Sequence, residues 1–256
     1  VKTYKCSNKE CYKKFTATVG TIFENTKIPL TKWFLAMYLI TAHKKGISSL
    51  QLSRDIGVTQ KTAWFINHRI REMLKDKAPE LLGNMVEIDE TYVGGKDTNR
   101  HKSKKKEGGA GMVHKTPMFG ILERGNKIRA GKVPAANGEV LKPIIFNTVK
   151  SGTTIVTDGF GAYRGLSKYF THIVVDHAAG EYVIGNYHTN TLEGFWSLFK
   201  RGIIGIYHYI SPKHIDRYCN EFTARYDTRE TSETQRFNCF LSQCKGRLKY
   251  QDLIRN

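Results

Sequence analysis

The sequence predicts an α/β (α+β) protein in which a mixed five-stranded sheet with helices follows a small helical domain. Three observations predict this class: residues 1–27 are rich in Lys, Thr and Cys, residues 28–78 have helical patterns, and strand-like runs then alternate with helical ones. We therefore expect a cysteine-bearing segment over 1–27, a helical domain over 28–78, a sheet domain over 84–230 and a C-terminal helical tail over 231–256.

The composition narrows the classes of protein to which the chain can belong. Lys and Arg number 41 against 23 Asp and Glu, so the formal net charge is +18, and the sequence pI is near 9.7. This charge predicts a polyanionic partner, most simply nucleic acid, with a basic surface kept for solubility as the alternative. The mean hydropathy of −0.44 and the short apolar run Trp33–Ile40 argue against a membrane protein, because a span needs ~20 apolar residues.

Cys6 and Cys11 resemble one knuckle of a zinc ribbon. Two thiolates a few residues apart can hold one side of a tetrahedral Zn²⁺, and a second pair must complete the site. The chain begins with Val1 rather than Met, so we expect the missing knuckle upstream and predict Zn²⁺ binding only where that knuckle is present. Two reduced cysteines on a small hairpin are the alternative.

Residues 47–74 have the pattern of a helix-turn-helix. Ser48 or Ser49 can cap a first helix, which Gly57 then ends in the left-handed conformation. Thr59 can cap a second helix that runs to about residue 74. A helix, a glycine-containing turn and a second capped helix are typical of this DNA-binding motif, although a plain helical hairpin is the alternative.

In a helix-turn-helix, the N-terminal residues of the second helix meet base edges, and basic side chains reach phosphates. We therefore expect exposed base-contacting residues and nearby phosphate-contacting residues, namely Gln60, Lys61, Thr62 and Asn67, with Arg69 and Arg71.

Five strands and two helices are expected in the sheet domain. The strands are Met85–Val93, Pro117–Leu122, Lys127–Val133, Thr153–Asp158 and His172–Asp176, and the helices are Val140–Val149 and Asn190–Arg201. The first three strands are separated by short connections and should form an antiparallel meander. The tract 96–111 is rich in Lys and Gly, has no apolar period and should be an exposed loop.

Three acids occupy distinct places in this plan. Asp89 lies at a strand centre, Asp158 at a strand end and Glu193 on the late helix. Carboxylates prefer Mg²⁺ or Mn²⁺, and two such ions ~3.5–4 Å apart can stabilise the attacking and leaving oxygens of an in-line displacement at phosphorus. Lys200 and Arg201 on the same helix can hold a phosphate.

The residues alone leave other assignments open. Asp89 or Asp158 can serve simply as a turn or cap residue. The competing ligand candidates are Glu87, Glu90, Asp176 and Glu181.

Three blocks of the chain resemble the motif blocks of the DDE transposases of bacterial insertion sequences. The blocks are Ile88–Lys96, Thr157–Gly159 and Asn190–Gly202, and Thr21–Glu24, Lys45–Leu50 and Lys61–Trp64 resemble the N-terminal region of the same branch. That branch combines a zinc ribbon, a helix-turn-helix and a ribonuclease-H-like catalytic domain. The resemblance implies that Asp89, Asp158 and Glu193 are the metal-binding catalytic triad, with Mg²⁺ or Mn²⁺ as cofactor.

The resemblance also implies a function and partners. The chain would bind the ends of its element through residues 47–75, hydrolyse the DNA, and direct the freed 3′-hydroxyl to target DNA. The expected partners are double-stranded DNA and further copies of the chain, as a homodimer or a larger synaptic complex, with no membrane and no small-molecule substrate. The expected location is cytoplasmic, at the nucleoid when DNA is bound. The 96–111 loop lies outside the core motif and is treated as an insertion that touches DNA through Lys104, Lys105 and Lys106.

Two other function classes stay open at this point. A non-catalytic helix-turn-helix protein, including an inactive transposase relic, would need only the helical domain. A ribonuclease acting on RNA–DNA hybrids would share the metal chemistry.

Overall fold

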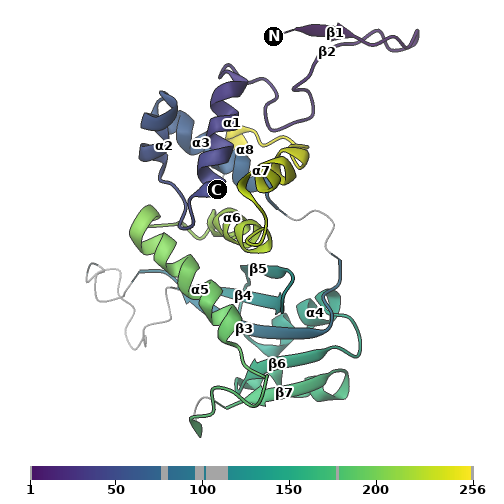
Figure 1. Ribbon diagram of the computed structural model, residues 1–256, viewed down its shortest axis with the longest axis vertical. Helices are drawn as coiled ribbons and strands as arrows, with labels where there is room; N and C mark the ends of the chain where they lie inside the picture. The colour runs from purple at the N-terminus through teal and green to yellow at the C-terminus, as the bar shows by residue number, and fades with distance from the viewer. Residues whose placement is uncertain (1, 76–79, 96–100, 102–114, 177–178, 255–256) are drawn as a thin grey trace. The chain divides into compact units, whose positions relative to one another are not determined.

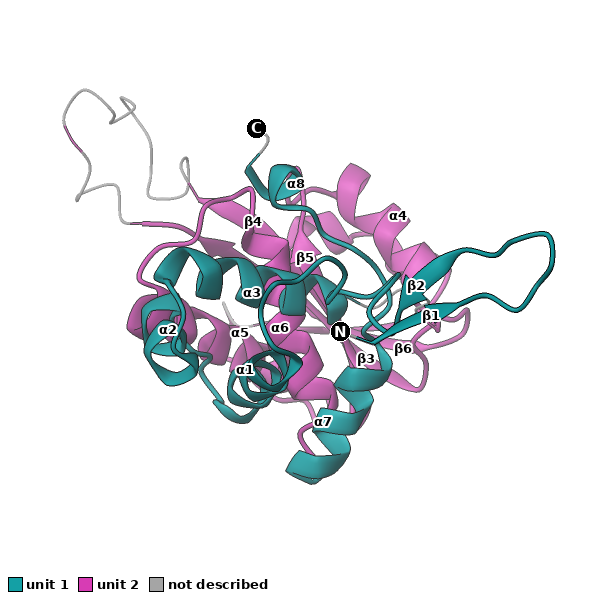
Figure 2. Ribbon diagram, turned by 90° about the horizontal axis from the view of Figure 1, so that it is seen from above, with its two compact units in different colours: residues 1–75, 231–256 teal, residues 76–230 magenta. Residues whose placement is uncertain are grey.

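The structure, a computed structural model, describes residues 2–75, 80–95, 101, 115–176 and 179–254. The chain divides into two compact units, which Figure 2 distinguishes by colour: unit 1 is residues 1–75 with 231–256, and unit 2 is residues 76–230. Residues 231–256, which the sequence predicts as a tail, therefore belong to the same unit as the N-terminal helices. Within the described ranges, no helix is both long and apolar enough to cross a membrane.

Unit 1 combines a small antiparallel hairpin with short helices (Figure 1). Its elements are β1 (Thr3–Lys5), β2 (Lys14–Thr16), α1 (Leu30–Ala42), α2 (Ser49–Ile56), α3 (Gln60–Met73), α7 (Glu233–Ser242) and α8 (Tyr250–Ile254). The Ser48 hydroxyl accepts the Gln51 N–H at 3.0 Å and caps α2, and Gly57 ends this helix with a φ of +59°. Thr59 caps α3 in the same way. The capped helices and the glycine turn between them are as the sequence predicts.

Unit 2 is built on a mixed five-stranded sheet in the order β5-β4-β3-β6-β7. Its strands are β3 (Met85–Val93), β4 (Thr116–Glu123), β5 (Ile128–Lys132), β6 (Thr154–Asp158) and β7 (Thr171–Val175). Strand β3 is antiparallel to β4, which is antiparallel to β5, whereas β3, β6 and β7 run parallel. This arrangement confirms the predicted fold class, a mixed five-stranded sheet with helices.

Helices cover both faces of this sheet (Figure 1). The helical elements of unit 2 are α4 (Gly138–Thr148), α5 (Asn190–Gly202), α6 (Ile215–Asp227), the short 3-10 turns η3 (Gly161–Tyr163) and η4 (Leu166–Lys168), and the π-helical turn η6 (Ile203–Tyr207). Because side chains alternate along a strand, Ile88 of β3 packs in one core with Leu141 of α4. Val93 packs in a second core with Phe199 of α5. The odd-numbered positions of β3 therefore lie toward α5.

A glycine allows α5 to lie close to the sheet. A Cβ atom built on Gly120 would lie 2.7 Å from Cζ2 of Trp196 and 3.0 Å from Cδ1 of Leu192, both on α5. Gly120 is also the register partner of Asp89 across β3 and β4. The missing side chain thus brings α5 against the sheet at the level of the central acid of β3.

Candidate active site

The parallel pairing of β3 and β6 places Asp89 and Asp158 at the same level of the sheet. The register joins Glu87 to Val156, and continuing it by two residues brings Asp89 opposite Asp158. Neighbouring residues at one level of a sheet point to the same face, so both carboxylates lie toward α5. The Asp158 carboxylate also accepts the Phe160 N–H at 3.0 Å, which fixes it at the end of β6.

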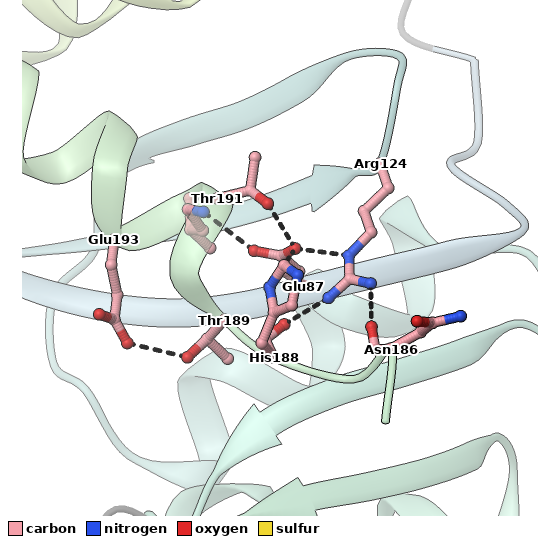
Figure 3. A network of polar contacts seen from close by, with 8 residues as sticks. Glu87, Arg124, Asn186, His188, Thr189, Thr191 and Glu193 are labelled. Atoms are coloured by element: carbon pink, nitrogen blue, oxygen red, sulfur yellow. Dashed lines mark hydrogen bonds and ion pairs between the residues drawn. The ribbon is translucent and has the colours of Figure 1, made fainter. Parts of the chain in front are cut away.

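Glu193 lies in the first turn of α5, at the start of the helix. Its N–H donates to the carbonyl of Thr189 at 3.0 Å, and the Thr189 hydroxyl donates to its Oε1 at 2.9 Å (Figure 3). Thr189 is only 1% exposed, so the donor that holds the Glu193 carboxylate is itself fixed by packing. The positive end of the helix dipole also favours a carboxylate at this position.

These three acids, which are distant in the sequence, lie within electrostatic reach of one another. The pKa of Asp89 is raised to about 8, and the largest cause is burial, which disfavours the charged carboxylate. The nearby carboxylates of Glu90, Asp158 and Glu193 each raise the same pKa further. The structure therefore brings Asp158 and Glu193 close enough to Asp89 for their charges to act on it.

Glu90 adds a fourth carboxylate to this neighbourhood. Burial raises its pKa, while a hydrogen bond from the Tyr163 hydroxyl opposes that rise. Tyr163 is buried in the core on the α4 side, and its own pKa is raised, chiefly by burial and next by the charge of Glu90. Glu90, a competing ligand candidate in the sequence, thus has a donor from η3.

Lys200 lies about two turns further along α5 than Glu193. Its pKa is lowered mainly by burial, and the negative charge of Asp89 opposes that fall. Lys200 is therefore a half-buried cation within electrostatic reach of Asp89. Arg201 is exposed, and its Nε donates to the carbonyl of Ser197 at 3.3 Å.

A fully buried acid, Glu87, connects β3 to the start of α5 (Figure 3). Glu87 is 0% exposed, and its Oε1 accepts from Nε of Arg124 at 2.6 Å and from the Thr191 hydroxyl at 2.8 Å. Its Oε2 accepts the Leu192 N–H at 2.9 Å. The sequence offered Glu87 only as a competing metal ligand. In the sequence, only its position two residues before Asp89, on the same face of the strand, indicated that Glu87 could contact the start of α5.

Arg124, at the end of β4, continues this network into the segment that precedes α5. It donates to the carbonyl of Asn186 and, at 2.8 Å, to the carbonyl of His188. Arg124 is not among the predicted site residues, because no local pattern in the turn between β4 and β5 shows which distant carbonyls this arginine contacts.

The donor set of the three acids suits a divalent cation of the Mg²⁺ type. Asp89, Asp158 and Glu193 offer only carboxylate oxygens, the ligands that such hard cations prefer. The repulsion that raises the pKa of Asp89 is also of the kind that a bound cation relieves. Among the described residues, no group of three or more His, Cys, Asp or Glu side chains is arranged so that it could hold a metal ion. The acids are gathered, and their role as metal ligands stays a prediction.

The cysteines of the predicted zinc knuckle lie in the connection of the β1–β2 hairpin. Cys6 donates its N–H to the carbonyl of Lys13, and both Cys6 and Cys11 carry free thiols. This hairpin is compatible with either interpretation of the two cysteines, and zinc binding stays a prediction.

The predicted DNA-contacting residues of α3 divide into two groups. Gln60 and Lys61 are exposed and Thr62 is half-buried at the start of the helix. The expectation that three further residues reach solvent or phosphates is wrong, because they are almost fully buried: Asn67 at 1%, Arg69 at 5% and Arg71 at 1% exposed.

The contacts of Arg69 give a physical reason for its burial. Its guanidinium donates to the carbonyl of Glu24 at 3.2 Å and lies 5.2 Å from the ring centre of Trp33 and 5.3 Å from that of Phe65. Burial lowers its pKa. This arginine therefore joins the N-terminal segment, α1 and α3 inside unit 1. The predicted contacts of Lys104, Lys105 and Lys106 lie outside the described residues.

Comparison with known proteins gives a family match over the part of the chain that carries the three acids. Residues 80–227 match the family defined as the ISXO2-like transposase domain. A protein of Halobacterium salinarum, described as an uncharacterized protein in transposable element ISH50, is 35% identical over 209 residues, which are 77% of this chain and 69% of the relative.

Solved structures with a likeness to this chain include a chain of a transpososome and a chain of an intasome. A chain of the pre-cleavage Mos1 transpososome is 14% identical with a TM-score of 0.34, and the match covers 87% of this chain and 82% of that one. A chain of the simian T-cell lymphotropic virus intasome, solved with a PP2A regulatory subunit, is 10% identical with a TM-score of 0.32, and the match covers 73% of this chain. The match spans 66% of the viral chain, just under two thirds of its length.

Proposed function

This chain belongs to the family of the ISXO2-like transposase domain, and on that premise we propose that it cuts and joins DNA with Asp89, Asp158 and Glu193 as its catalytic carboxylates. The observation that carries the proposal is the proximity of these acids: burial raises the pKa of Asp89 to about 8, and the nearby carboxylates, among them Asp158 and Glu193, contribute to the rise. The reaction would be hydrolysis of a phosphodiester at an element end, followed by attack of the freed 3′-hydroxyl on target DNA.

Each side chain of the site has a distinct task in this proposal. Asp89, Asp158 and Glu193 would hold Mg²⁺ or Mn²⁺, which when bound supplies Lewis acidity to the attacking and leaving oxygens. Thr189 orients the Glu193 carboxylate through its hydroxyl. Lys200 lies close enough to sense the charge of Asp89 and would hold a phosphate of the DNA next to the acids.

DNA recognition is proposed for the exposed start of α3. Gln60, Lys61 and Thr62 lie in its first turn, where residues of a helix-turn-helix meet base edges. Arg201 is exposed on unit 2 and would contact the DNA backbone. The proposed partners are the element ends, the target duplex and further copies of this chain, which together would hold the two ends of the element for joining.

The catalytic half of the proposal is tested with a duplex that carries the element's own ends. The full chain should nick it only with Mg²⁺ or Mn²⁺ present, and Asp158→Asn should abolish nicking without changing the temperature of unfolding by more than a few degrees. The matched control is Asp216→Asn, because Asp216 is exposed and the amide oxygen can still accept the Lys132 N–H. Full nicking by Asp158→Asn would show that the triad assignment is wrong.

The same assay separates the alternative functions. A chain that binds the ends but never nicks them would be a non-catalytic DNA-binding protein. A chain that cuts an RNA–DNA hybrid and leaves the matched DNA duplex intact would be a ribonuclease.

The binding half is tested by equilibrium binding to the end duplex. Replacing Gln60 and Lys61 together by Ala should weaken end binding by about tenfold or more, because a good contact to a base edge contributes about 1–3 kcal/mol. Lys168→Ala is the control, since it removes an exposed positive charge from η4 instead. Unchanged end binding by the double variant would exclude this face of α3 as the recognition surface.

A further inference from the structure

We propose that Glu87, together with Arg124, is the positioning residue that fixes the start of α5, and with it Glu193, against the strand that carries Asp89. This inference rests on the proposed function for its catalytic meaning. Its structural content concerns only contacts within unit 2.

The N-terminus of α5 is capped by a residue outside the helix. The first turn of any helix leaves backbone N–H groups without intrahelical acceptors, and the N-cap side chain commonly accepts one of them. Here the Thr189 hydroxyl donates to Glu193, and the carboxylate of Glu87 accepts the Leu192 N–H at 2.9 Å. The cap of α5 thus comes from β3, a distant part of the chain, which frees Thr189 to orient the proposed metal ligand.

The spacing of two acids along β3 relates the start of α5 to Asp89. Glu87 and Asp89 are two residues apart on one face, so their Cα atoms are separated by roughly 6.6 Å. Glu87 is bonded to Thr191 and Leu192, and Glu193 is the next residue of α5. Anchoring the helix at Glu87 therefore sets how far the Glu193 carboxylate lies from that of Asp89.

Arg124 holds the segment that leads into α5. Arg124 uses Nε for Glu87 and its two terminal nitrogens for the carbonyls of Asn186 and His188. One guanidinium thus joins the anchoring acid to the backbone that leads into α5 (Figure 3). A lysine in its place would have a single nitrogen and could not make the same set of contacts in this planar arrangement.

These contacts also distinguish Glu87 from a metal ligand. Both of its carboxylate oxygens accept hydrogen bonds, and its side chain is 0% exposed. Its charge is matched by Arg124 at 2.6 Å. The geometry assigns Glu87 to holding the helix, while the acid two residues later stays available to a cation.

The test compares Glu87→Gln with Glu221→Gln in the full chain. Glu221 is a matched control because it is also 0% exposed and bonded to an arginine, Arg225, at 2.5 Å in the same unit. The measurements are the affinity for Mn²⁺ alone by titration calorimetry, the hydrogen exchange of the Leu192 and Glu193 amides, and the kcat and KM of DNA nicking.

A glutamine at position 87 presents an NH₂ group where Glu87 has an accepting oxygen, so the start of α5 should loosen. In Glu87→Gln, Mn²⁺ affinity should fall about 10- to 100-fold, the usual effect of losing a partner that orients a metal ligand. Exchange of the Leu192 amide should rise about tenfold or more, because its acceptor is weakened. The kcat should fall while the KM for DNA stays within about twofold, and Glu221→Gln should change none of these by more than that factor.

The inference is overturned if Glu87→Gln matches Glu221→Gln in both Mn²⁺ affinity and amide exchange. Should Glu87→Gln fail to fold, Thr191→Val decides, because it removes one bond to Glu87 and keeps a branched side chain of similar size. Unchanged Mn²⁺ affinity in Thr191→Val would then contradict the inference. A wild-type chain that nicks no DNA would refute the proposed function, whereas a selective loss of Mn²⁺ affinity in Glu87→Gln would still support the positioning role.

Discussion

Glu87 and Asp89, two acids on the same face of β3, have opposite environments. Glu87 is fully buried, paired with Arg124 and hydrogen-bonded to the start of α5. Asp89 lies near the carboxylates of Asp158 and Glu193, and burial together with these neighbouring charges raises its pKa to about 8. The two acids are separated by a single residue of the strand.

This difference shows how one strand can both build a site and supply its chemistry. A buried acid that is paired and hydrogen-bonded stabilises a fixed geometry, and removing its partner is costly. A buried acid that faces other acids destabilises the folded chain until a proton or a cation arrives. Unit 2 places the first kind two residues from the second, and in our proposal the paired acid fixes the position of the catalytic acids.

The largest effect is expected when a carboxylate near Asp89 loses its charge. Glu193→Gln should lower the rate of metal-dependent nicking by about a thousandfold or more, since partners that merely orient a ligand cost 10- to 100-fold. Glu139→Gln is the matched control, because Glu139 is an exposed glutamate in the first turn of α4. Equal nicking rates for the two variants, measured on the end duplex, would remove Glu193 from the catalytic set.

The next effect concerns the ion pair of Glu87 and Arg124, because breaking it should lower the stability of the protein. Arg124→Met should lower the free energy of unfolding by about 3 kcal/mol, because it removes the arginine that balances the charge of the buried Glu87 carboxylate. Adding Glu87→Leu should recover part of that loss, since an apolar pair has no charge to compensate. Urea unfolding measures both variants, and a double variant no more stable than Arg124→Met would argue against this account.

The double variant also separates stability from positioning. Its nicking rate should stay low even where its stability recovers, because leucine at position 87 cannot accept the Leu192 N–H. Recovery of both properties together would mean that the Glu87–Arg124 pair contributes stability alone.

Removing the charge of Asp89 should stabilise the protein, and the size of this effect should depend on pH. The unfolded chain releases the Asp89 proton near pH 3.8 and the folded chain near pH 8, so wild-type stability falls as pH rises between these values. Asp89→Asn removes this term and should raise the free energy of unfolding by a few kcal/mol at pH 9 and by much less at pH 5. Thermal unfolding in chelator measures it, with Asp216→Asn as a control, and a pH-independent difference would contradict the raised pKa.

The smallest effect tests the close approach of α5 to the sheet at Gly120. Gly120→Ala should destabilise unit 2 by about 1–3 kcal/mol, because its Cβ would overlap Trp196 in a packed core. Gly194→Ala should instead stabilise by about 0.5–1 kcal/mol, since its Cβ meets nothing within 4 Å and alanine favours a helix. The pair is compared by denaturant unfolding, and destabilisation of similar size in both variants would disprove the close-approach argument.

Much of the fold could be predicted from local sequence patterns. Alternation over residues 85–93 predicted β3 to the residue, and the Gly57 turn followed by the Thr59 cap predicted the start of α3. These features depend on neighbours within a few positions, which is the range over which alternation, capping and glycine conformation act.

The candidate site could be predicted in part. The three acids were selected by resemblance and by their places on strands and helix, and the fold brings them together. The burial of Arg69 was not predicted, because its partners Glu24 and Trp33 come from a segment that no local pattern connects to α3.

The sequence by itself determined the periodicities, the caps and the family, since each is written in adjacent residues. Only the tertiary structure decided which acid is paired with an arginine and which lies beside other carboxylates. Glu87 and Thr191 are 104 residues apart in the chain, yet they are hydrogen-bonded in the fold. The charge state and role of a buried carboxylate depend on such long-range neighbours, because burial and pairing, rather than residue type, set the energy of its charged form.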